Sequence, residues 1–205
     1  MIDEARDDPS FDRLVFIGPP GSVKTTAMRG CRNAIDPVRS PHLNKPASVE
    51  DLMVWARSNW VVGLDNVNWF SEDMMDAICG LSTGQGHGDR AHYTNDEATD
   101  FFLSRLVMMT SITSALGRGD VLSRTLDIAT SRIAGSDRKL IAEVEAEFNA
   151  VHALLLGAPL DIATAGLRGA SRPKELPRMA DFFMWGVAAS AVLELSLIHI
   201  DAADE

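Results

Sequence analysis

Residues 14–26 constrain the fold more than any other part of this chain. Four apolar residues, Leu14 to Ile17, are followed by a turn-rich stretch with two glycines and two prolines, and then by Lys24 and Thr25. An apolar run without alternation is typical of a strand that is buried on both faces. A strand, a glycine-rich turn and a helix that begins with lysine and threonine form the arrangement of a phosphate-binding loop. The segment therefore predicts a strand–loop–helix unit that binds a polyphosphate.

The spacing of the loop residues supports this prediction. The pattern G-x-x-x-x-G-K-[ST] is met at every fixed position but one by Gly18, Pro19, Pro20, Gly21, Ser22, Val23, Lys24 and Thr25. In such loops backbone N–H groups surround the phosphates, the lysine reaches the β- and γ-phosphates, and the hydroxyl binds Mg²⁺. We therefore expect residues 18–26, which include Thr26, to bind ATP with Mg²⁺. The alternative is a glycine-rich turn that matches by chance.

Val23 is the exception, because the pattern has glycine at this position. A β-branched side chain is stiff, and glycine is the residue that tolerates positive φ. If the backbone needs positive φ here, valine costs on the order of 1–3 kcal/mol of strain. We expect this strain to slow turnover more than it disturbs the fold.

A second acidic site is predicted at Asp65. It follows the apolar residues 60–64, as expected for a carboxylate at the carboxyl end of a central strand. We expect Asp65 to bind Mg²⁺ together with Thr25; the alternative is a cap of a helix or turn. Asn66 follows, where many ATPases have a glutamate that activates water. An amide can orient a water molecule but cannot accept its proton, and Glu72 or Asp73 could substitute.

Composition limits the class of protein. The chain has 205 residues, 46% hydrophobic and 23% charged, which suits one large soluble domain or a core with an appendage. A net charge of −10 argues against a broad basic face that coats nucleic acid. No stretch approaches the roughly 20 uninterrupted apolar residues of a membrane span, so we expect no membrane partner. Cys31 and Cys79 form no disulfide or metal pattern, and a cytoplasmic location is expected.

Strands that alternate with helices predict an α/β fold, a three-layer parallel sheet of the P-loop NTPase (AAA+/RecA-like) type. The expected strands cover residues 14–17, 60–64, 106–109 and 125–130, and the expected helices cover residues 24–34, 48–59 and 71–79. This core is assigned to residues 1–135. Residues 136–205 are assigned to a small helical lid and a C-terminal tail.

The glycine-rich residues 84–88 are expected to lack regular structure. The segments 90–94 and 99–103 are expected to form the two arms of a hairpin. Trp55, Trp60, Trp69 and Trp185 are expected to pack in the core or between subunits rather than to stack on bases.

The order of these segments resembles the ATPase domain of phage and mobile-element primase–helicases, which are similar to superfamily III helicases of the AAA+ class. The resemblance covers most of the chain. It rests on residues 18–25, 61–66, 76–86 with Arg90, Tyr93 and Thr94, 106–112, 118–124 and 177–182. Family members carry a further N-terminal region, so the resemblance implies that this chain is a fragment or a degenerate copy. Residues 195–200 follow no family pattern, and we expect the natural C-terminus to be missing from this sequence.

The resemblance implies a ring-forming homo-oligomeric ATPase that moves or opens DNA. Lys24, Thr25 and Asp65 would bind nucleotide and Mg²⁺, and Thr110 stands where the family has a polar sensor, commonly asparagine. Arg124 would be an arginine finger that completes a neighbouring subunit's site. A structural salt bridge is the alternative for Arg124.

DNA contact is implied for residues 83–93, with Arg90 as the candidate phosphate contact. A solvated surface arginine is an equal alternative. Arg178 would act as a lid sensor. Arg105 could instead take the DNA-contact role of Arg90 or the arginine-finger role of Arg124. Because Val23, Asn66 and Thr110 depart from the family pattern, a nucleotide-binding interaction module without hydrolysis remains a rival. A small-molecule kinase is a further rival, disfavoured by the few arginines of residues 140–165.

Overall fold

The computed structural model describes residues 13–39, 44–89, 99–113, 121, 125–169, 171–176 and 180–192. Residues group into two compact units. One unit is Phe11–Leu140, and the other combines Met1–Ser10 with Ile141–Glu205. Each unit is described by itself below.

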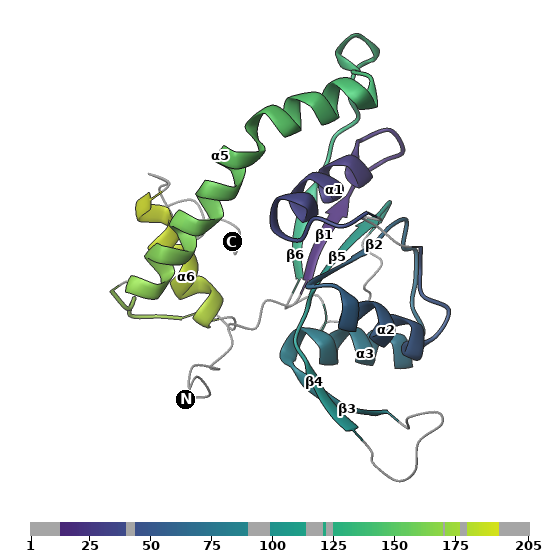
Figure 1. The fold of residues 1–205 in the computed structure, drawn as a ribbon, viewed down its shortest axis with the longest axis vertical. Coiled ribbons are helices and arrows are strands. Elements are labelled where there is room, and N and C mark those ends of the chain that lie inside the picture. Colours follow the sequence, from purple (N-terminus) through teal and green to yellow (C-terminus); the bar gives the residue numbers. More distant parts are fainter. Residues whose placement is uncertain are drawn as a thin grey trace. The chain divides into compact units, whose positions relative to one another are not determined.

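A four-stranded parallel sheet forms the centre of the unit Phe11–Leu140 (Figure 1). Its strands are β1 (Arg13–Ile17), β2 (Val61–Leu64), β5 (Leu106–Ser111) and β6 (Thr125–Ala129). Their order in the sheet is β2-β5-β1-β6, and all three pairings are parallel. All four expected strands are therefore confirmed, with ends shifted by up to two residues.

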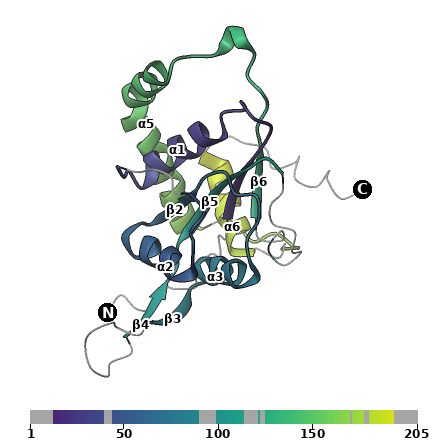
Figure 2. The same cartoon turned by 90° about the vertical axis from the view of Figure 1, so that its right-hand side faces the viewer.

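Helices cover both faces of this sheet, as Figures 1 and 2 show. Successive residues of a strand point to opposite faces. Phe16 and Met108 pack with Met28 of α1 (Lys24–Ile35) on one face. Val15 and Met109 pack on the other face, with α2 (Val49–Ser58) and α3 (Glu72–Thr83). The prediction of a three-layer α/β unit with a parallel sheet is thus confirmed.

Serine caps fix the starts of two helices. The Ser48 hydroxyl accepts a hydrogen bond of 3.2 Å from Asp51 N–H at the start of α2. The Ser71 hydroxyl accepts one of 3.4 Å from Met74 N–H at the start of α3. Such caps satisfy backbone donors that the first turn leaves without partners. Both starts were expected, whereas α3 continues to Thr83 rather than ending near Cys79.

Residues 85–88 of the glycine-rich stretch are regular, which corrects the expectation that residues 84–88 lack regular structure, whereas Gly84 is the C-cap of α3. β3 (Gln85–Asp89) pairs antiparallel with β4 (Thr99–Leu103), and Gln85 lies opposite Leu103. Backbone hydrogen bonds to a neighbouring strand outweigh the low strand propensity of glycine. The second expected arm is confirmed, but the first arm is Gln85–Asp89. Residues 90–94, and with them Arg90, lie outside the described residues.

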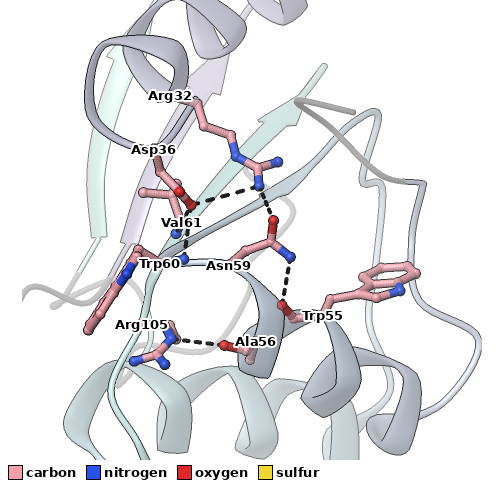
Figure 3. A network of polar contacts seen from close by, with 8 residues as sticks. All are labelled: Arg32, Asp36, Trp55, Ala56, Asn59, Trp60, Val61 and Arg105. Atoms are coloured by element: carbon pink, nitrogen blue, oxygen red, sulfur yellow. Dashed lines mark hydrogen bonds and ion pairs between the residues drawn. The ribbon is translucent and has the colours of Figure 1, made fainter. Parts of the chain in front are cut away.

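The amino ends of the strands carry a polar network that ties α1 to the junction of α2 and β2 (Figure 3). One Asp36 carboxylate oxygen accepts hydrogen bonds from the N–H groups of Trp60 and Val61, both at 2.9 Å. The Arg32 guanidinium donates to Asn59 Oδ1 at 2.7 Å and lies 4.0 Å from Asp36. Burial lowers the pKa of Arg32, and the Asp36 charge acts in the opposite direction.

Arg105 belongs to this amino edge. Its Nε donates to the Ala56 carbonyl at 2.8 Å, and its guanidinium lies 4.4 Å from the centre of the Trp60 ring. Burial lowers its pKa, opposed by the Asp36 charge. Because Arg105 precedes β5, it lies at the opposite edge of the sheet from the loop after β1. Within one chain it therefore does not reach that loop. The expectation that Arg105 contacts DNA or completes a neighbouring subunit's site stays a prediction.

Two tryptophans are exposed rather than packed in the core. Trp60 is 70% exposed and Trp69 is 63% exposed. Lys45 Nζ lies 3.3 Å from the centre of the Trp69 ring, in a cation–π arrangement. Trp55 packs against the core of α2 and α3, as expected. Packing between subunits stays a prediction for the two exposed rings.

The second unit contains α5 (Ile141–Arg168) and α6 (Ala180–Val192), which pack against each other. A side chain at Gly166 would collide with the Trp185 ring, so glycine permits the close approach. The helices are confirmed, whereas their role as a lid stays a prediction. By length and composition alone α5 could cross a membrane. A single helix of this kind is weak grounds for a membrane span.

Candidate functional site

Polar residues gather at the carboxyl edge of the parallel sheet. The loop of residues 18–23 follows β1, Asp65 follows β2, Thr110 is the last residue but one of β5, and Thr130 follows β6. The carboxyl ends of parallel strands meet at one edge of a sheet, where α/β folds bind their ligands. The topology therefore brings together residues that are far apart in the sequence.

Asp65 is the centre of this cluster. Its Oδ1 accepts hydrogen bonds from the hydroxyl of Thr110 at 2.6 Å and from that of Thr25 at 2.8 Å. Asn66 N–H donates to the Thr110 hydroxyl at 2.8 Å, and Val67 N–H donates to the Thr110 carbonyl at 2.8 Å. The structure thus places the expected metal ligands, Thr25 and Asp65, in contact, together with the expected sensor Thr110.

Lys24 closes the loop on itself. Its ammonium donates to the carbonyls of Gly18 at 2.6 Å and Pro19 at 2.9 Å, and to the Ser22 hydroxyl at 3.4 Å. A lysine ammonium has three N–H donors, so these contacts occupy all of them. The oxygens that hold the ammonium belong to the loop that is expected to surround phosphate.

Val23 has left-handed backbone geometry, with φ 54° and ψ 23°, at the residue before α1. Gly21 in the same loop has φ 78°, and Asn66 after β2 has φ 54°. Only glycine adopts this region without cost, and asparagine tolerates it better than a β-branched residue does. The loop therefore has the backbone geometry that calls for glycine at residue 23, and valine adopts it under strain.

Thr130 joins the site although no motif indicates it. Its N–H donates to the Ile17 carbonyl at 2.7 Å, and its hydroxyl lies 2.8 Å from the hydroxyl of Ser22, which is fully buried. A side chain at Gly18 would collide with the carbonyl and hydroxyl oxygens of Thr130. This close approach is a sufficient reason for glycine at residue 18. The one available signal was a polar residue at the end of an expected strand.

The other expected site residues are placed as follows. Thr26 is partly buried in the first turn of α1, and the loop residues Pro19 and Pro20 are exposed. Glu72 and Asp73 are exposed in the first turn of α3. Arg124 and Arg178 lie outside the described residues, so their expected roles are not tested.

The oxygen atoms of the cluster fit Mg²⁺ better than a transition metal. Mg²⁺ takes hard oxygen ligands, keeps several waters and is commonly held by one or two carboxylates together with substrate phosphates. The Thr25 hydroxyl and the Asp65 carboxylate are ligands of this kind. Within the described ranges, no three or more His, Cys, Asp and Glu side chains gather as a metal site.

The fold and this edge define an α/β protein with a parallel sheet, helices on both faces and a polar cluster at the carboxyl ends of the strands. The chain belongs to the family of actinomycete integrative conjugative element replication proteins, whose model matches residues 9–201. Membership of a replication-protein family of mobile elements is therefore shown. The finer assignment to primase–helicases stays a prediction.

Solved structures show weaker likenesses. The JCV helicase has a TM-score of 0.45 and 15% identity, over 92% of this chain and 52% of that chain. The C-terminal region of NrS-1 has a TM-score of 0.44 and 8% identity, over 72% of this chain and 35% of that chain. The chain thus spans about half or less of these structures, and the likeness is too low to carry a conclusion. No curated protein matches the chain.

Proposed function

We propose that this chain binds ATP with Mg²⁺ at residues 18–26 and works as a ring-forming, DNA-dependent, helicase-like ATPase in the replication of a mobile element. One observation carries the proposal. The hydroxyls of Thr25 and Thr110 meet on Asp65 Oδ1 directly beside a glycine-containing loop that leads into α1. The family assignment supports the replication setting.

The proposed roles follow from the chemistry of each group. Loop N–H groups and the start of α1 would bind the phosphates, and the Lys24 ammonium would leave its loop oxygens for the β- and γ-phosphates. Bound Mg²⁺ would neutralise phosphate charge, with Thr25 and Asp65 as its protein ligands. Thr110 would hold the Asp65 carboxylate in place, and Asn66 would orient a water molecule. Arg124 from a neighbouring subunit and residues 83–93 against DNA complete the proposal.

A second candidate is a nucleotide-binding interaction module that does not hydrolyse ATP. Two observations favour it: the strained backbone of Val23, and an amide rather than a carboxylate at residue 66. In this case ATP binding would control assembly of the replication machinery, without turnover.

Titration calorimetry with ATP·Mg²⁺ tests binding, with Lys24→Ala as the comparison and oligomer mass measured on the same samples. We expect the wild type to bind and Lys24→Ala to lose at least about tenfold in affinity, because charge-assisted hydrogen bonds are lost. Absence of binding by the wild type at millimolar ATP would reject both candidate functions.

Phosphate release with and without single-stranded DNA separates the two candidates. Stimulation by DNA in the assembled oligomer supports the motor. Tight binding without phosphate release, with release restored by Val23→Gly, supports the interaction module.

A further inference from the structure

The segment after β6 passes beside the loop of residues 18–23, within the same unit. Thr130 is tied to this loop through the Ser22 hydroxyl, and Ile133 N–H points to the Gly21 carbonyl at 3.5 Å. The segment continues through a short 3-10 turn, Gly135–Asp137, to Arg138. Residues 130–138 are here called the flanking segment.

Arg138 reaches the loop itself. A Cβ atom placed on Gly21 would lie 3.8 Å from Arg138 Nη2. Gly21 has φ 78°, so it stands at the turn of the loop where a side chain would be strained. Within the part of the chain that the structure describes, no hydrogen bond or ion pair engages Arg138. An exposed guanidinium therefore lies beside the loop without a structural role of its own there.

The sheet order gives this position its meaning. β6 lies next to β1 on the side away from β5, whereas Asp65 and Thr110 lie on the β5 side. The loop after β1 therefore has the polar cluster around Asp65 on one side and the flanking segment on the other. A polyphosphate held by the loop would have cations on both sides, Mg²⁺ with Lys24 on one side and Arg138 on the other.

We propose that Arg138 is a phosphate-binding residue of the nucleotide site, supplied by the same chain. This inference rests on the proposed function. A guanidinium is always charged and presents paired N–H donors that match phosphate oxygens. The flanking segment is held beside the loop by the hydroxyl pair of Thr130 and Ser22 and by the Ile133 N–H at the Gly21 carbonyl.

The test is titration of ATP·Mg²⁺ into the full chain carrying Arg138→Ala, Arg138→Gln or Arg138→Lys. We expect the Ala and Gln variants to weaken binding about tenfold, because a charge-assisted hydrogen bond is lost, and the Lys variant to stay within about threefold. Arg39→Ala is the matched control, because it removes the same charge beyond the carboxyl end of α1 and should leave affinity unchanged. Thermal unfolding shows whether each variant is folded.

Each outcome decides the inference. Unchanged affinity in Arg138→Ala overturns it, and so does a Lys variant no better than the Gln variant, because any cation should keep part of a phosphate contact. If the wild type binds ATP·Mg²⁺ and Lys24→Ala does not, either of these two results rejects the role of Arg138 and leaves the proposed function standing. If the wild type does not bind, the proposed function fails and the role of Arg138 fails with it.

Discussion

The Thr110 hydroxyl donates a hydrogen bond of 2.6 Å to Asp65 Oδ1, across the neighbouring parallel strands β5 and β2. The same hydroxyl oxygen accepts the Asn66 N–H at 2.8 Å. Thr110 is 1% exposed, so both bonds are shielded from water. One buried hydroxyl thus fixes both the carboxylate and the left-handed turn that follows it.

Replacing Thr110 therefore tests this arrangement. Thr110→Val keeps the shape but leaves Asn66 N–H without its acceptor, and should lower the free energy of unfolding by about 1–3 kcal/mol. Thr110→Ser keeps the hydroxyl and should lose about 1 kcal/mol or less, for one buried methyl group. Urea unfolding measures both. Equal losses in the two variants would show that the hydroxyl does not matter for stability.

Val23→Gly should stabilise the chain. Glycine removes about 1–2 kcal/mol of backbone strain at this left-handed position. The more flexible unfolded chain offsets part of this, so we expect the free energy of unfolding to rise by about 0.5–1 kcal/mol. The matched control is Val54→Gly in the exposed interior of α2, which should lose about 0.5 kcal/mol. The two thermal midpoints should shift in opposite directions. A fall in both would contradict the strain at Val23.

Gly18→Ala should destabilise the fold. The new methyl group meets the Thr130 oxygens, and overpacking of this kind costs about 1–3 kcal/mol. Gly135→Ala in the same unit meets nothing within 4 Å and should change stability by less than about 0.5 kcal/mol. Urea unfolding of both variants compares them. A Gly18→Ala protein as stable as the wild type would rule out the close approach of Thr130.

Asp36→Ala should weaken the amino edge of the sheet. It removes the acceptor of two backbone N–H groups and a charge beside Arg32, and should cost about 2–3 kcal/mol. Asp36→Asn keeps one acceptor oxygen and should cost less. Tryptophan fluorescence during urea unfolding measures the stability of both variants, and ATP affinity should stay near the wild-type value because the opposite edge is intact. Equal stability of both variants and the wild type would reject this anchoring role.

Much of the site was accessible from the sequence because its parts are local signals. An apolar run with a lone acid behind it placed Asp65, and serines before acidic turns placed the starts of α2 and α3. The β3 strand was missed, because its stability comes from pairing with β4 rather than from its glycine-rich residues. The position of Arg138 beside Gly21 could not be predicted for a related reason. Nothing near it in the sequence marks it, and only the pairing of β6 with β1 brings it beside Gly21.

The three contacts of Lys24 within its own loop have a consequence for ligand entry. The Lys24 ammonium already lies 2.6 and 2.9 Å from two carbonyl oxygens of the loop. A phosphate that binds there would therefore have to compete with these oxygens for the ammonium. Arg32 and Asp36 anchor the far end of α1, away from this loop. Under the proposed function, phosphate binding would then require a rotation of the Lys24 side chain alone, with little rearrangement of the loop and α1.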